Sequence, residues 1–232
     1  MSAIKSLPLQ VRLQRPVIRW GFRAGYHLAA RVEILGHENI PKEGPYLITF
    51  NHVSVFDPPL LIGFWPRPPE VLAAEYLWDR NGFGSIMRGY GAIPVSSDFF
   101  DRKLLNTSLD ILHSGKILVV APEGTRSHQP GLLPGKPGIA YIARKADATI
   151  LPVGITGTTS ELFKRAVRLK RSDVTMRIGA PFHLPKSESK DLDRRAIRQK
   201  NVDLVMTKIA ELLPEEYRGV YAHTVSNPPL SA

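Results

Sequence analysis

The chain alternates short apolar runs rich in β-branched residues with segments whose apolar residues recur at helical spacing. The apolar runs cover residues 46–50, 71–74, 92–95, 117–121, 149–155 and 174–178. The helical patterns cover residues 60–65, 101–114, 139–145 and 191–213. Strands that alternate with helices form largely parallel sheets with helices on their faces. The sequence therefore predicts an α/β fold, a single domain with a mostly parallel central sheet flanked by helices.

Length and composition place few further limits on the chain. Its 232 residues suit one domain with a substantial buried core. Hydrophobic residues make up 43% and charged residues 22%, which is ordinary for a folded soluble or peripheral protein. The absence of cysteine excludes disulfides, thiolate catalysis and zinc–thiolate sites. We divide the chain into a basic N-terminal segment (1–32), a main domain (33–222) and a loose tail (223–232).

The net charge of +10 is concentrated near the N-terminus. Residues 1–32 contain no acidic side chain, and their basic residues are Lys5, Arg12, Arg15, Arg19, Arg23 and Arg31. Pro16 suits the start of a helix, because its missing N–H costs little there. One side of such a helix carries a cationic stripe: Arg15, Arg19, Arg23 and His27. Trp20 and Tyr26 suit the headgroup level of a membrane.

This pattern predicts an amphipathic helical segment that lies on an anionic membrane surface. Each basic residue near such a surface contributes about 1 kcal/mol to the free energy of membrane binding. The alternative is a helix packed on the protein with a solvated basic side. Arginines interrupt every window long enough to cross a bilayer, so we expect a peripheral protein on the cytoplasmic face of a membrane. A second basic cluster fits either a membrane or carrier-protein contact or a solvated loop: Lys164, Arg165, Arg168, Lys170 and Arg171.

His52 and Asp57 follow directly after the apolar run 46–50. A neutral imidazole can take a proton from an alcohol, and a carboxylate can hold its tautomer and stabilise the imidazolium. Pro58 disfavours helical geometry at Asp57, which predicts a loop that lets the two side chains meet. Such a pair suits an enzyme in which the hydroxyl of a substrate attacks. Taken alone, the spacing favours the simpler interpretation, in which Asp57 caps the next helix and His52 is an interior histidine.

Three further segments accompany this pair. In chain order they are Gly91-Ala92-Ile93-Pro94-Val95, Pro122-Glu123-Gly124-Thr125-Arg126-Ser127 and Leu151-Pro152-Val153. With Asn51 to Asp57 in front of them, these segments resemble the four blocks of the glycerolipid acyltransferases. The resemblance is greatest to the 1-acyl-glycerol-3-phosphate (lysophosphatidic acid) acyltransferases, and it extends from about Val32 to about Pro181. The complete set is far more specific than any one block.

The resemblance implies the chemistry of acyl transfer. His52 would deprotonate the sn-2 hydroxyl of 1-acyl-glycerol-3-phosphate, and Asp57 would orient His52. The hydroxyl would attack the thioester of acyl-CoA or acyl carrier protein, giving phosphatidic acid. Neither a metal nor a cofactor is expected. The expected partners are a lysophospholipid acceptor, the acyl donor and an anionic membrane surface, and nucleic acid is not among them.

The third block implies the acceptor-binding residues. By resemblance, the phosphate-bearing acceptor is bound by Glu123, Gly124, Thr125 and Arg126. Arg126 offers a planar fork of donors that matches a phosphate. Glu123 is expected to hold Arg126 or the glycerol of the acceptor. Lys136 lies where the family often has Lys-x-Gly, and it is either a further cation of the site or a surface lysine.

The second block departs from the family at Ser97. Many members carry an arginine at this position, thought to contact the phosphate of the acceptor. The departure leaves the identity of the acceptor open. The acceptor could be a lysophospholipid with another headgroup, or it could be glycerol 3-phosphate. Basic residues near the block that could substitute are Arg88, Arg102 and Lys103.

Two other classes of protein remain as alternatives. A hydrolase could use the same His–Asp pair to activate water, although the Gly-x-Ser-x-Gly elbow of serine esterases is missing. A non-catalytic binder is the second alternative. The basic charge would permit nucleic acid, but the sequence carries no recognised nucleic-acid motif.

Overall fold

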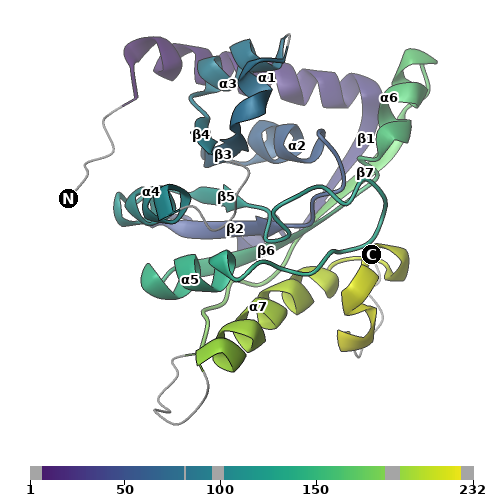
Figure 1. The fold of residues 1–232 in the computed structure, drawn as a ribbon. Helices are drawn as coiled ribbons and strands as arrows, with labels where there is room; N and C mark the ends of the chain where they lie inside the picture. Colours follow the sequence, from purple (N-terminus) through teal and green to yellow (C-terminus); the bar gives the residue numbers. More distant parts are fainter. Residues whose placement is uncertain (1–6, 81, 96–101, 186–193, 226–232) are drawn as a thin grey trace.

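The computed structural model describes residues 7–80, 82–95, 102–185 and 194–225, which form one sheet with helices on both faces (Figure 1). The strands are β1 (Ala30–Leu35), β2 (Tyr46–Phe50), β3 (Glu70–Ala74), β4 (Ile93–Val95), β5 (Leu118–Val120), β6 (Thr149–Thr156) and β7 (Ser172–Ile178). Their order in the sheet is β1-β7-β6-β2-β5-β3-β4. Every neighbouring pair is parallel except β6 and β7. The predicted α/β fold class is confirmed.

Two layers of helices cover the sheet. The α-helices are α1 (Leu9–Ala29), α2 (Asp57–Phe64), α3 (Phe83–Tyr90), α4 (Arg102–His113), α5 (Gly138–Lys145), α6 (Ser160–Val167) and α7 (Arg194–Ala210). The first core cluster lies beneath α4, α5 and α7, while the other clusters lie beneath α1, α2, α3 and α6. Strand β2 supplies both layers, because Leu47 joins the first cluster and Ile48 joins the second. The alternation of side chains along a strand explains this division.

Several predicted boundaries are wrong. Pro16 does not begin a helix but lies inside α1, where it removes one backbone hydrogen bond from a long helix that packs along the protein. Asp57 is helical, because Pro58 and Pro59 occupy the first turn of α2, where their missing N–H groups cost little. Strand β1 and helices α3 and α6 were not predicted. The boundary drawn after residue 32 falls within β1.

Other predictions fall partly outside the described residues. Ser97 is not described, and neither are residues 191–193 of the last predicted helix, which ends at Ala210 and not at residue 213. The tail predicted from residue 223 begins inside a 3-10 helix, Gly219–Thr224.

Three arginines on the basic side of α1 bind other parts of the protein. Arg15 is buried, forms an ion pair of 2.6 Å with Glu70, and donates from Nε to the carbonyl of Tyr90. Arg19 Nε donates to Ile62 O, and Arg23 Nη2 donates to Gly63 O, both at 2.9 Å. These carbonyls belong to the last turn of α2, which lacks intrahelical partners. The predicted solvated or membrane-facing basic side is therefore wrong for Arg15, which is buried, and for Arg19, which is half-buried, whereas Arg23 stays exposed while it hydrogen-bonds to the end of α2.

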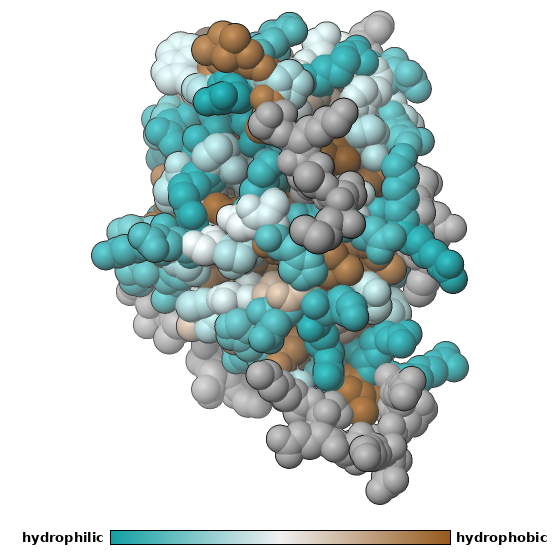
Figure 2. Space-filling model, turned by 90° about the vertical axis from the view of Figure 1, so that its left-hand side faces the viewer, coloured by the Kyte–Doolittle hydropathy of each residue, from teal (hydrophilic) through white to brown (hydrophobic). Residues whose placement is uncertain are grey.

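The outward side of α1 is apolar instead. Its exposed large apolar residues are Leu9, Leu13, Val17, Trp20 and Leu28. Trp20 is 72% exposed and Leu28 is 81% exposed. Apolar side chains lie uncovered at the top of Figure 2, on the side of the molecule where α1 runs in Figure 1. None of the helices in the described ranges has the length and hydropathy that a membrane crossing requires.

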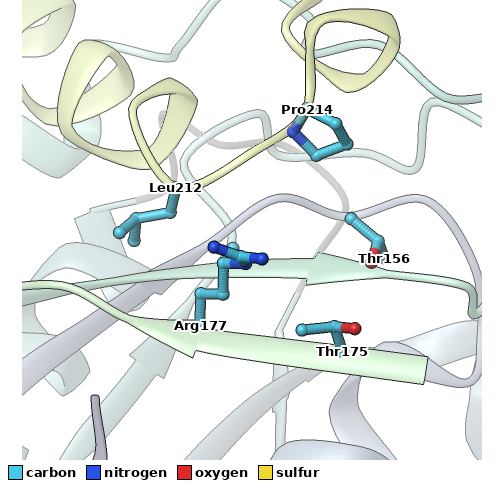
Figure 3. Close-up of a pocket in the computed structure, with 6 residues that line it drawn as sticks. Thr156, Thr175, Arg177, Leu212 and Pro214 are labelled. Atoms are coloured by element: carbon cyan, nitrogen blue, oxygen red, sulfur yellow. The ribbon is translucent and has the colours of Figure 1, made fainter. Parts of the chain in front are cut away.

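A small hollow lies between strands β6 and β7 and the segment that follows α7. Its volume is about 100 Å³, and its lining residues are Gly154, Thr156, Thr175, Arg177, Leu212 and Pro214 (Figure 3). None of the residues with a predicted function lines this hollow. The residues with a predicted function lie instead beyond the ends of the parallel strands.

Candidate active site

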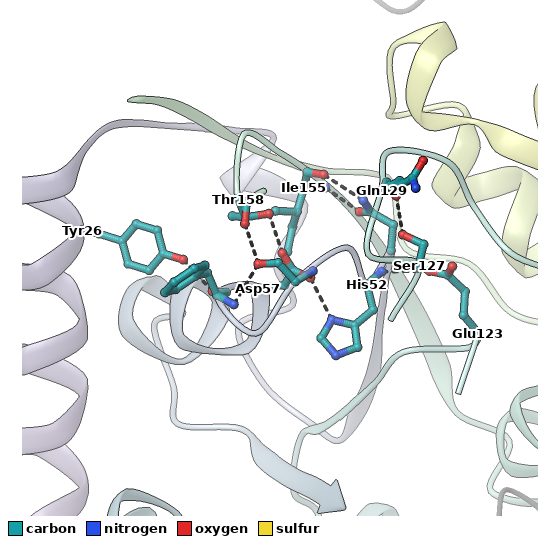
Figure 4. Close-up of polar contacts among 11 residues, drawn as sticks. Tyr26, His52, Asp57, Glu123, Ser127, Gln129, Ile155 and Thr158 are labelled. Carbon is teal, nitrogen blue, oxygen red and sulfur yellow. Dashed lines mark hydrogen bonds and ion pairs between the residues drawn. The ribbon is translucent and has the colours of Figure 1, made fainter. Parts of the chain in front are cut away.

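Three parallel strands end at the same edge of the sheet. Strand β2 lies between β5 and β6 and is parallel to both. His52 follows β2, Glu123 follows β5 and Thr158 follows β6. Ligands of α/β sheets bind at the carboxyl ends of the strands. Figure 4 shows that these side chains gather beside the N-terminus of α2.

His52 and Asp57 form a hydrogen-bonded pair. Nδ1 of His52 lies 2.8 Å from Oδ2 of Asp57, whose side chain is fully buried. A carboxylate only accepts hydrogen bonds, so the proton of the imidazole is on Nδ1 and Nε2 has the lone pair. No group in the described ranges hydrogen-bonds Nε2. The predicted meeting of the two side chains is confirmed by this contact.

The carboxylate of Asp57 has two further donors. The backbone N–H of Ser54 donates to Oδ2 at 2.8 Å. The hydroxyl of Thr158 donates to Oδ1 at 2.5 Å. Asp57 also occupies the first position of α2, where the helix dipole favours a negative charge. Every oxygen of the buried carboxylate therefore has a donor, and its orientation toward His52 is fixed.

The backbone of His52 is held on both sides by the third block. Its N–H donates to Oε1 of Glu123 at 2.8 Å, and its carbonyl accepts from the N–H of Ser127 at 2.9 Å. Oε2 of Glu123 accepts from the N–H of Leu133 at 2.8 Å. Glu123 is 1% exposed. Of the two roles expected for Glu123, holding Arg126 is wrong, because its carboxylate binds the N–H groups of His52 and Leu133 instead, while holding the glycerol of the acceptor stays a prediction.

Burial raises the pKa of Glu123 to about 7, although the hydrogen bonds from the N–H groups of Leu133 and His52 act in the opposite direction. Burial disfavours a charged carboxylate because water no longer solvates it. A carboxyl group with this pKa is partly protonated at neutral pH. The contact that positions His52 therefore depends on a group that is costly to ionise.

Several residues of the site were missed in the sequence analysis. The side chain of Asn51 pairs with both the N–H and the carbonyl of Ile155, and so continues the contact between β2 and β6. The hydroxyl of Ser54 donates to the carbonyl of Thr158. The hydroxyl of Tyr26 in α1 donates to Phe56 O at 2.5 Å. For Asn51 and Thr158 the available signal was position, because both follow the carboxyl end of a predicted strand.

The remaining predicted residues lie around the same loop. Gly124 has a positive φ of 71°, which suits the tight turn at the end of β5. Thr125 is exposed and Arg126 is half-buried. The side chain of Lys136 is exposed, and its backbone N–H donates to Pro122 O at 2.8 Å. The structure therefore brings Lys136 next to the third block. In the described ranges, no group of His, Asp and Glu side chains could hold a metal ion.

The fold is an α/β sheet that carries a hydrogen-bonded His–Asp pair at the carboxyl edge of its parallel strands. A family model described as Acyltransferase matches residues 31–156, more than half of the chain. The chain belongs to this acyltransferase family and is an enzyme of that class.

The chain is similar to several proteins named 1-acyl-sn-glycerol-3-phosphate acyltransferase. It is 26% identical over 186 residues to the 1-acyl-sn-glycerol-3-phosphate acyltransferase of Bacillus subtilis (strain 168), covering 76% of this chain and 89% of that protein. The protein of the same name from Saccharomyces cerevisiae is 29% identical over 69% of this chain, which spans only 56% of the yeast protein. The crystal structure of the 1-acyl-sn-glycerophosphate (LPA) acyltransferase PlsC from Thermotoga maritima superposes with a TM-score of 0.60 and 26% identity. That match covers 83% of this chain and 78% of PlsC.

The contact between Thr158 and Asp57 yields the first prediction. Thr158→Val keeps the shape of the side chain and removes the hydroxyl that donates to Oδ1. A hydrogen bond to a charged group contributes about 1.5–3 kcal/mol, so we expect kcat/KM of acyl transfer to fall by about 10- to 100-fold. Thr158→Ser keeps the hydroxyl and should retain most of the activity. Full activity in a folded Thr158→Val protein would show that Asp57 does not need this donor.

The raised pKa of Glu123 yields the second prediction. In the unfolded chain Glu123 loses its proton near its ordinary pKa of 4.5, whereas in the folded protein it keeps the proton up to its raised pKa of about 7. Between these two pH values the folded protein binds a proton that the unfolded chain has released. The free energy of unfolding therefore falls as pH rises through this window. Glu123→Gln does not titrate and should lack this decline. Across the window the difference in stability between the two proteins should change by up to about 3 kcal/mol in urea denaturation. A constant difference would contradict the prediction.

Proposed function

We propose that the enzyme transfers a fatty acyl group from acyl-CoA or acyl carrier protein to the sn-2 hydroxyl of 1-acyl-glycerol-3-phosphate, giving phosphatidic acid. The observation that carries the proposal is the contact between His52 Nδ1 and Asp57 Oδ2 at the carboxyl edge of the sheet. It leaves Nε2 to accept a proton. The names of the similar proteins, which are 1-acyl-sn-glycerol-3-phosphate acyltransferases, support lysophosphatidate as the acceptor.

The reaction begins when Nε2 of His52 takes the proton of the acceptor hydroxyl as its oxygen attacks the thioester carbonyl. The negative charge that develops on the carbonyl oxygen collapses as the carbon–sulfur bond breaks. The leaving thiolate then takes the proton from the imidazolium. Asp57 stabilises the imidazolium while it exists, and its donors Ser54 and Thr158 keep it oriented. Neither a metal nor a cofactor is needed for these steps.

The loop after β5 would bind the acceptor. The guanidinium of Arg126 matches a phosphate, and Lys136 would add positive charge beside the same loop. Glu123 would contribute indirectly, because it positions the backbone of His52. Phosphate binding on this loop would bring the hydroxyl of the acceptor toward Nε2 of His52.

We also propose that the enzyme acts on the cytoplasmic face of a membrane through the outward side of α1. A row of large exposed apolar side chains on one helix is typical of a membrane contact. Helix α6 lies next to the end of α1 and exposes Phe163 and Val167 beside basic residues of the predicted second cluster (Figure 1). Attraction to anionic lipid would therefore come mainly from the basic residues around α6, since Arg15, Arg19 and Arg23 of α1 hydrogen-bond to the protein.

The third prediction tests the reaction. We expect the wild-type protein to transfer a labelled acyl group from acyl-CoA to lysophosphatidate, in preference to glycerol 3-phosphate and to lysophospholipids with larger headgroups. His52→Ala should lower the rate by about 100-fold or more, because it removes the general base. An active His52→Ala protein would contradict the mechanism. If only hydrolysis of the thioester depended on His52, the enzyme would be a hydrolase.

The fourth prediction concerns the membrane contact. Trp20→Glu places a charge in the apolar row of α1 and should weaken binding to sedimenting phospholipid vesicles by about tenfold or more. Val220→Glu is the matched control, because Val220 is 49% exposed but lies in the 3-10 helix Gly219–Thr224, away from α1. Deletion of residues 1–31 is a poorer test, because it would also remove the hydrogen bonds that Arg15, Arg19 and Arg23 donate to the rest of the protein. Equal binding of both variants would contradict the proposed surface.

A further inference from the structure

Tyr76 lies between two guanidinium groups beside the candidate active site. Nη2 of Arg126 lies 3.5 Å from the hydroxyl of Tyr76. The guanidinium carbon of Arg80 lies over the ring of Tyr76, 5.5 Å from its centroid. Tyr76 is 47% exposed, so its ring and hydroxyl remain accessible. The sequence analysis singled out neither Tyr76 nor Arg80.

The topology of the sheet explains why these residues meet. Tyr76 belongs to the 3-10 helix Glu75–Trp78, which directly follows β3. Strand β3 is parallel to β5 and lies beside it, and Arg126 belongs to the loop that follows β5. The same loop holds His52 through the N–H of Ser127. The three side chains therefore reach the edge of the sheet at which the His–Asp pair lies.

The two guanidinium groups have no carboxylate partner in the described part of the chain. Elsewhere in the protein arginines do have such partners, as Arg15 has Glu70 and Arg31 has Asp173. Glu75 and Asp79 are exposed on the turn around Tyr76, yet neither forms an ion pair with Arg80. Guanidinium groups that are not neutralised, grouped around one phenol, suit a ligand that brings its own negative charge.

We propose that Tyr76 and Arg80 complete, together with Arg126, a subsite for the phosphate monoester of the acceptor. This inference rests on the proposed function, since it names residues that would bind the headgroup of lysophosphatidate. The hydroxyl of Tyr76 positions Arg126, and its ring positions Arg80 by a cation–π contact. The two arginines can then reach different oxygens of one phosphate.

The subsite also accounts for Ser97. In many family members the second cation comes from the end of the second block, which in this chain follows β4. Strand β4 pairs with β3. Arg80, from the turn after β3, would thus supply the second cation of the subsite from the neighbouring strand and substitute for the missing arginine. Such a subsite favours a phosphate monoester, which exposes more charged oxygens than the phosphodiester of a larger headgroup.

The experiment compares the steady-state kinetics of wild type, Arg80→Gln and Tyr76→Phe with lysophosphatidate and acyl-CoA. Arg80→Gln should raise KM for lysophosphatidate by about tenfold and leave KM for acyl-CoA unchanged, because one charge-assisted contact is lost. Tyr76→Phe keeps the ring and should cause a smaller rise. The inhibition constant of glycerol 3-phosphate, a soluble probe of the headgroup contact, should rise in parallel with KM for lysophosphatidate.

Arg67 provides a matched control. Its guanidinium carbon lies over the ring of Tyr46 at 5.5 Å, the same distance as in the pair of Arg80 and Tyr76. Arg67 precedes β3 and Tyr46 begins β2, so this pair lies at the opposite edge of the sheet. Arg67→Gln should leave both KM values unchanged.

The outcomes separate the two proposals. If Arg80→Gln leaves KM for lysophosphatidate unchanged, or if Arg67→Gln raises it equally, the subsite is overturned while the proposed reaction stands. A wild-type protein that acylates no phosphate-bearing acceptor overturns the proposed function and the subsite together. That failure is visible in the wild-type protein alone, without any variant.

Discussion

The two backbone hydrogen bonds of His52 are the constraint on which the active site depends. Its N–H donates to Glu123 and its carbonyl accepts from the N–H of Ser127. The loop after β5 therefore fixes the position of His52, which follows β2. Asn51 makes an equivalent pair of contacts to Ile155 in β6. The imidazole therefore extends from a peptide that two neighbouring strands hold in place. Side-chain packing alone would leave its direction less defined, and small errors in direction are costly for proton transfer.

This arrangement places a carboxyl group where water cannot solvate it. Glu123 is 1% exposed, and burial raises its pKa to about 7 despite two hydrogen bonds from backbone N–H groups. A glutamine would offer only one acceptor oxygen, so one of the two N–H groups would lose its partner. The carboxylate is thus the side chain that satisfies both His52 and Leu133, although its ionisation in this position weakens the folded state at higher pH. Active sites commonly retain such locally unfavourable groups.

The sequence predicted well what depends on local pattern and poorly what depends on distant partners. Strands such as β2 and β6 were found because continuous apolar runs are typical of buried parallel strands. Strand β1 was missed because Arg31 and Glu33 interrupt its apolar residues at the edge of the sheet. The arginines of α1 were assigned to a membrane because their partners, the carbonyls at the end of α2, lie some 40 positions along the chain. Glu123 was expected to hold Arg126 or the glycerol of the acceptor, because the backbone N–H groups that bind its carboxylate, those of His52 and Leu133, lie outside its block and leave no local pattern in the sequence.

Helix α1 connects the proposed membrane contact to the helix that carries Asp57, α2. On its inner side, Arg19 and Arg23 bind the C-terminal turn of α2, and the hydroxyl of Tyr26 binds Phe56 O just before its first residue, Asp57. The approach is close, because a Cβ at Gly63 would lie 3.2 Å from the α1 backbone. On its outer side, α1 carries the apolar row proposed to contact lipid. A membrane that held this row would therefore hold α2, and with it Asp57, at a fixed depth. An acceptor whose acyl chain stays in the bilayer presents its hydroxyl at a fixed height, and a rigid link between α1 and α2 would keep His52 at that height.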